Sequence, residues 1–110
     1  MSFIAVMSAL DTTVQELRVE THRGAFTDKL AQIVSALGVV PDSVVGEVVA
    51  GDVTRLGELV DETIEAIERR LESQLDAPDV QQQLAGTVYE LRRRMEAIDV
   101  WFHHVSQLPR

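Results

Sequence analysis

A heptad-spaced apolar stripe near the C-terminus places the strongest constraint on the fold of this chain. Apolar side chains there alternate at intervals of four and three residues, at Leu84, Val88, Leu91, Met95, Ile98, Phe102 and Val105. This spacing keeps the side chains on one face of an α-helix and is typical of a helix that packs lengthwise against another. The stripe therefore predicts a long helix over about residues 79–106.

A second apolar stripe precedes the first and predicts the helix against which it packs. Its side chains recur every three or four residues, at Val53, Leu56, Val60, Ile64, Ile67, Leu71 and Leu75. Asp52 is a favourable N-cap for this helix, and Pro78 suits a first helical turn after a break. We therefore expect helices over about 52–75 and 79–106, joined by a tight turn at 76–78 into a long antiparallel hairpin.

The first forty residues contain two shorter helical patterns. The first places Phe3, Met7, Leu10, Val14 and Leu17 on one face. Gly24 suits the end of this helix, although a helix that begins only at Asp11, leaving residues 2–9 as an arm, is an open alternative. Thr27 is a typical N-cap for a second helix, and Gly38 suits the position just past its end. The apolar stripe of that second helix comprises Leu30, Ile33, Val34 and Leu37.

Residues 39–53 fit two kinds of secondary structure. Their seven valines favour a strand by propensity. Pro41, Asp42 and Ser43 instead resemble a helix start, and no other strand is evident with which a strand here could pair. We expect a short helix, or a helical turn, at 42–49. The whole chain, 1–110, is then predicted to be a single all-α domain of helical-bundle type, with two or three shorter N-terminal helices before the long hairpin.

The charge balance and the absence of cysteine exclude several classes of function. The chain has 18 acidic and 10 basic residues, for a net charge of -8, and no cysteine. Nucleic acids and anionic membranes attract clustered Lys and Arg, so neither is expected as a partner. Thiol chemistry and disulfides are excluded. The N-terminal segment lacks a basic region and is too short to span a bilayer, so a cytoplasmic location is expected.

The short segment "WFHH" invites a metal-site interpretation, which the spacing does not favour. His103 and His104 are adjacent, so their side chains diverge by about 100° on a helix. Asp99 and His103 are suitably spaced for two ligands, yet no third ligand is evident. The chain also lacks the glycine-rich phosphate loops and the serine elbow. We therefore expect no metal, no cofactor and no catalytic residues, and a helix-end role for both histidines.

Three consecutive arginines, Arg92, Arg93 and Arg94, leave two interpretations open. In an antiparallel hairpin they would lie beside Asp61, Glu62 and Glu65 and pair with them internally. Alternatively, they could bind a phosphate or an acidic partner.

A further set of large apolar residues predicts an interface. Leu59, Tyr89, Val100 and Trp101 lie beside the two main stripes, and Phe102 belongs to the C-terminal stripe itself. They must be covered either by the N-terminal helices or by a partner, which could be a second copy. The expected function is a non-catalytic protein–protein interaction module, such as an adaptor, small chaperone or assembly factor. The alternatives are a small helical enzyme, or an acidic inhibitor that mimics nucleic acid.

Overall fold

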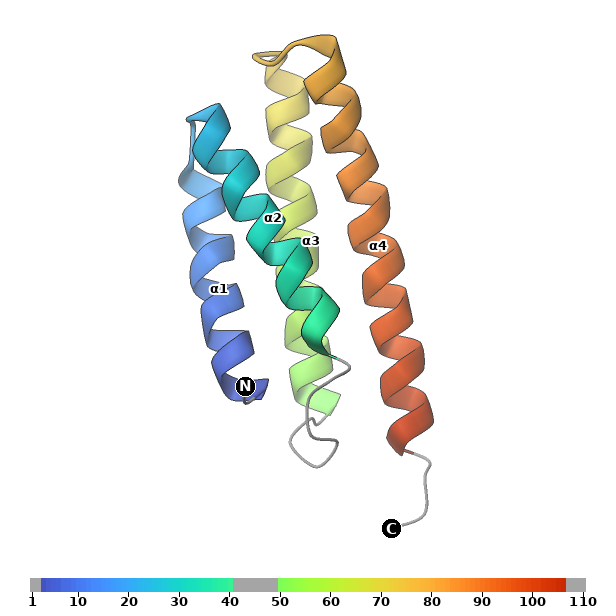
Figure 1. Cartoon of the computed structure of the whole chain (residues 1–110). Coiled ribbons are helices and arrows are strands. Elements are labelled where there is room, and N and C mark those ends of the chain that lie inside the picture. The colour runs from blue at the N-terminus through green and yellow to red at the C-terminus, as the bar shows by residue number, and fades with distance from the viewer. Residues whose placement is uncertain (1–2, 41–49, 107–110) are drawn as a thin grey trace.

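The computed structural model describes residues 3–40 and 50–106, with side chains for 4–40 and 51–104. Within these residues it contains four α-helices and no strand (Figure 1). The helices are α1 (Phe3–Val19), α2 (Arg23–Val39), α3 (Ala50–Ser73) and α4 (Pro78–Ser106). The prediction of an all-α bundle is confirmed. The short helix expected at 42–49 lies outside the described residues.

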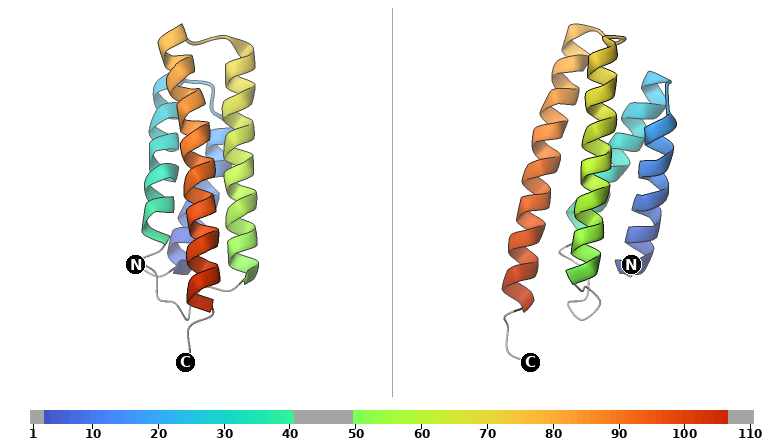
Figure 2. Two further views of the ribbon diagram at one scale, coloured as in Figure 1. Left: turned by 90° about the vertical axis from the view of Figure 1, so that its right-hand side faces the viewer. Right: turned by 180° about the vertical axis from the view of Figure 1, so that it is seen from behind.

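The four helices pack as two antiparallel pairs. α1 packs against α2, and α3 packs against α4, while α1 joins the pairs by packing against α3. α2 packs only lightly against α4, so α4 is held chiefly by α3 and lies at one edge of the bundle (Figure 2). One broad side of α4 therefore faces away from the other helices.

The two apolar stripes form most of the core between α3 and α4. Buried members of the α4 stripe are Leu84, Val88, Leu91 and Ile98, while Met95 and Phe102 are half-buried. Buried members of the α3 stripe are Leu56, Val60, Ile64 and Ile67, with Val53 and Leu71 half-buried. Leu75 was expected to continue this stripe but is 73% exposed, because α3 ends at Ser73 and Gln74 adopts a left-handed backbone conformation (φ 53°).

The turn between α1 and α2 differs from the prediction. α1 is continuous from Phe3, so residues 3–9 belong to it and do not form a separate arm, and it ends at Val19 rather than near Gly24. α2 already begins at Arg23, which places Gly24 and Thr27 inside it. α2 begins earlier than predicted because Phe26, which is 2% exposed, adds one turn to the buried face of this helix. That face consists of Phe26, Leu30, Ile33 and Leu37.

Two other helix ends also differ from the sequence-based expectation. Gly38 lies within α2, and the helical backbone continues to Val40, whose side chain is fully buried. Asp52 is in the first turn of α3 rather than at its N-cap, since α3 begins at Ala50. Pro78 is the first residue of α4, as predicted. Burial of Val40 thus outweighs the tendency of glycine to end a helix.

Candidate interaction surface on the outer face of α4

The side of α4 that faces away from the core carries two large exposed apolar residues. Tyr89 is 70% exposed and Val100 is 66% exposed. Arg93 and Glu96 lie between them and are also exposed. At 100° per residue these four positions share one side of the helix, opposite the buried Leu91 and Ile98. We call this set the outer face of α4: Tyr89, Arg93, Glu96 and Val100.

The other aromatic residues of the predicted interface are placed differently. Trp101 and Phe102 are half-buried and pack against the hydrophobic core, so they are not part of the outer face. His103 and His104 are both exposed near the end of α4. The predicted set therefore divides between a surface part, Tyr89 and Val100, and a part held mainly by the fold.

Leu59 does not lie at the surface, contrary to its place in the predicted interface. It is 1% exposed and belongs to the core. The buried arc of α3 is wide because this helix packs against both α1 and α4. Thr63, one turn on, is also buried, and its hydroxyl donates to the Leu59 carbonyl at 2.8 Å. The spacing of Leu59, Thr63 and Ala66 was the signal for this second buried stripe.

The arginine run is only partly paired within the bundle. Arg92 reaches Glu68 at 3.5 Å, and Arg94 donates to Glu90 at 2.9 and 3.1 Å. Among the described residues, neither forms an ion pair with the expected Asp61, Glu62 or Glu65. Side chains lean toward the N-terminus of their own helix, so in an antiparallel pair Arg92 meets a carboxylate nearer the turn.

Arg93 differs from its two neighbours in having no ion pair with any residue of the described part of the chain. Arg94, by contrast, leans toward α2, since a Cβ added at Gly38 would lie 3.2 Å from its Nη1. Arg93 is therefore the charge of this run that the outer face presents to solvent. Its binding to an acidic group outside the chain stays a prediction.

A groove between α2 and α4 is a second apolar feature. It encloses about 370 Å³, and its lining includes Leu30 and Val34 from α2 with Val80 and Leu84 from α4. Thr27, Ser35, Gln83 and Thr87 are among its polar lining residues. Because Leu30 and Leu84 are themselves nearly inaccessible, the groove exposes little of its apolar floor.

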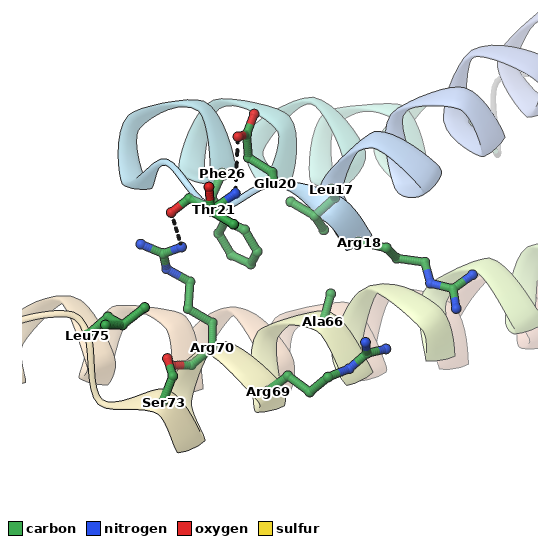
Figure 3. A pocket seen from close by; sticks show the side chains of 10 residues that line it. All are labelled: Leu17, Arg18, Glu20, Thr21, Phe26, Ala66, Arg69, Arg70, Ser73 and Leu75. Atoms are coloured by element: carbon green, nitrogen blue, oxygen red, sulfur yellow. Dashed lines mark hydrogen bonds between the residues drawn. The ribbon is translucent and has the colours of Figure 1, made fainter.

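A cavity of about 180 Å³ lies beside the α1–α2 turn and the end of α3, and its lining includes Arg70, which forms the least exposed ion pair among the described residues (Figure 3). Arg70 donates to Asp76 at 2.7 and 3.1 Å and to the Thr21 carbonyl at 3.0 Å. Its guanidinium also lies 4.9 Å from the centre of the Phe26 ring. The Arg70 and Asp76 side chains are only 8% and 3% exposed. We call this group the Arg70 clamp: Arg70, Asp76, Thr21 and Phe26.

The clamp links the α1–α2 turn to the α3–α4 turn. Arg70 lies near the end of α3, Asp76 follows in the next turn, and Thr21 and Phe26 come from the other helix pair. The hydrogen bonds from Arg70, with its positive charge, hold the pKa of Asp76 below its ordinary value, and desolvation opposes them. Since the guanidinium and the carboxylate satisfy each other, the arrangement fits a structural role.

The described residues contain no cluster of three or more metal-ligating side chains. Among those same residues, no helix is both long enough and apolar enough to span a lipid bilayer. Comparisons with protein-family models, curated proteins and solved structures found no match to this chain.

Proposed function

We propose that the chain is a non-catalytic protein–protein interaction module, an adaptor, small chaperone or assembly factor, that binds through the outer face of α4. The observation that supports this most is the exposure of Tyr89 and Val100 on a straight helix, with Arg93 between them. Tyrosine and arginine are enriched among the residues that dominate binding energy at interfaces. A rigid helix presents them at little entropic cost. The cysteine-free composition is compatible with the cytoplasm, where we propose that it acts.

Both competing functions have weaker support from the described side chains. An enzyme needs polar groups that converge on a cavity and are free to meet a substrate, whereas the Arg70 clamp consists of groups that bond to one another. An acidic inhibitor needs a continuous negative surface. α3 has an exposed acidic stripe of Glu58, Asp61, Glu65, Glu68 and Glu72. Three of these five carboxylates pair with arginine, which interrupts the stripe.

The proposed function predicts that two surface substitutions remove binding. The chain and its Tyr89→Ser/Val100→Ser variant would each be immobilised and exposed to a lysate of the native host. A matched control is Val19→Ser/Leu75→Ser, which removes two apolar groups that are 80% and 73% exposed elsewhere. Proteins retained by the unmodified chain and by the control should be lost from the outer-face variant.

Circular dichroism should show that all three proteins are equally helical, so that a loss of binding reports on the surface alone. Retention of the same bound proteins by the outer-face variant would contradict the proposal. The proposal would also be contradicted if none of the three immobilised proteins retained any protein, including a second copy of the chain itself.

A further inference from the structure

The outer face of α4 has a palindromic order of residues. Tyr89, Arg93, Glu96 and Val100 follow one another at intervals of four, three and four residues. This is the spacing of a helix-packing seam, and it recurs here on the side of α4 opposite the core seam. Apolar residues occupy the two ends, and a basic and an acidic residue occupy the middle. The intervals between these residues are therefore the same from either end, and the two central residues have opposite charges.

From this order we propose that the partner of the outer face is a second copy of the chain, with the two α4 helices packed antiparallel. The inference rests on the proposed function of this face. A two-fold axis midway between Arg94 and Met95 places Tyr89 opposite Val100 of the second copy. The same axis places Arg93 opposite Glu96 of the second copy. Since each contact occurs twice in an isologous interface, both apolar residues and both charges are matched.

Flanking residues support the same register. Arg92 and Asp99 lie on one side of the outer face, and both are exposed. With a rise of 1.5 Å per residue, the two-fold symmetry brings Arg92 to within about 3 Å of Asp99 of the second copy, measured along the helix. On the other flank, Gly86 and Ala97 are small and allow close approach of the helix backbones. Opposite charges at flanking positions are a common determinant of helix pairing.

The charge distribution favours this face as the place where two copies meet. The chain carries a net charge of -8, so two copies repel each other over most of their surface. The outer face contributes one arginine and one glutamate and is therefore neutral. α4 also lies at one edge of the bundle, so that another helix can reach its outer face (Figure 2). A single pair of helices gives a small interface, for which a micromolar Kd is expected.

Charge exchange tests the pairing of Arg93 with Glu96. Arg93→Glu and Glu96→Arg, taken singly, each place like charges opposite each other twice, and each should raise the dimer Kd by at least about tenfold. The double variant Arg93→Glu/Glu96→Arg restores opposite charges in the same register and should recover most of the affinity. Sedimentation over a range of concentrations measures the dimer Kd of the unmodified chain and of the three variants. Equal Kd values for all variants, or no recovery in the double variant, would overturn the register.

Cysteine crosslinking tests the direction of the helices, because the chain has no cysteine of its own. Tyr89→Cys and Val100→Cys would be prepared as two single variants and mixed. A dimer with one of each retains one of its two Tyr89–Val100 contacts and places the two new thiols opposite each other. In a dimer of Tyr89→Cys alone, the two thiols are about 16 Å apart along α4. A thiol-specific crosslinker of shorter reach should therefore give a covalent dimer with the mixture and little with either single variant. Efficient crosslinking of Tyr89→Cys alone would indicate a parallel pair and overturn the inference.

The second-copy inference and the proposed function can fail separately. If the unmodified chain is a monomer at roughly 100 µM, well above a micromolar Kd, the second copy is excluded as the occupant. The proposed function then still stands if the lysate experiment shows a different protein that Tyr89→Ser/Val100→Ser no longer binds.

Discussion

Asp76→Ala is expected to destabilise the fold by about 3–5 kcal/mol, because it leaves the buried guanidinium of Arg70 without its carboxylate. The two side chains are 8% and 3% exposed and share two hydrogen bonds. Removing one partner of a buried pair costs more than the pair itself contributes, since the remaining charge stays desolvated. A urea melt followed by circular dichroism measures the free energy of unfolding.

Two control variants separate burial of the charge from other effects. Arg69→Ala removes an exposed pair with Glu65 and should change stability by less than about 0.5 kcal/mol. Arg70→Met/Asp76→Leu replaces both charges with apolar groups and should be more stable than Asp76→Ala. A loss below about 1 kcal/mol for Asp76→Ala would mean that the clamp does not hold the two turns together.

The Arg70 clamp also predicts a specific loss of stability in acid. The pKa of Asp76 is lowered in the folded state, mainly by the hydrogen bonds from Arg70. A carboxylate of this kind contributes stability above its unfolded pKa of about 3.9 and loses it as the pH falls through the lower folded pKa. Unfolding free energies measured from pH 7 downward should therefore fall less steeply for Asp76→Ala than for the unmodified chain.

Some acid sensitivity should remain in that variant, since a second carboxylate behaves in the same way. Lys29 donates to Glu20 at 3.0 Å and lowers the pKa of Glu20. Identical pH profiles for Asp76→Ala and the unmodified chain would show that Asp76 does not titrate differently in the folded and unfolded states.

The second large effect is expected in the core seam. Leu91 is fully buried between α3 and α4, so Leu91→Ala should cost about 2–5 kcal/mol through lost burial and the cavity left behind. Phe102 occupies the same seam but is only half-buried, so Phe102→Ala should cost less than Leu91→Ala. Val100→Ala, on the outer face, should leave the unfolding free energy of the monomer nearly unchanged. The reverse order of these costs, from urea melts at low protein concentration, would contradict the placement of the core.

Periodicity was enough to predict the long helices, but less so their ends. The stripes of α3 and α4 depend only on residues within each helix, which is why their spacing was readable. The ends of α1 and α2 depend on the burial of Phe26 and Val40 in the core, which is a tertiary effect. Glycine at positions 24 and 38 was therefore a misleading signal for helix ends.

The candidate surface and the clamp illustrate the same limit. Tyr89 and Val100 could be placed off the core seam from spacing alone, and both are exposed. Leu59 could not be placed correctly, because the width of the buried arc of α3 depends on how many neighbours that helix has. Burial of Arg70 was also not predictable, because it depends on Thr21 and Phe26, which are distant in the sequence.

The mass of the chain in solution tests the central claim most directly. Light scattering at roughly 100 µM, well above a micromolar Kd, should give about twice the 12.2 kDa of one chain. Tyr89→Ser/Val100→Ser should give the mass of a single chain at the same concentration, with unchanged helix content. If the two proteins have the same mass, whether one chain or two, the outer face of α4 does not join copies of this protein.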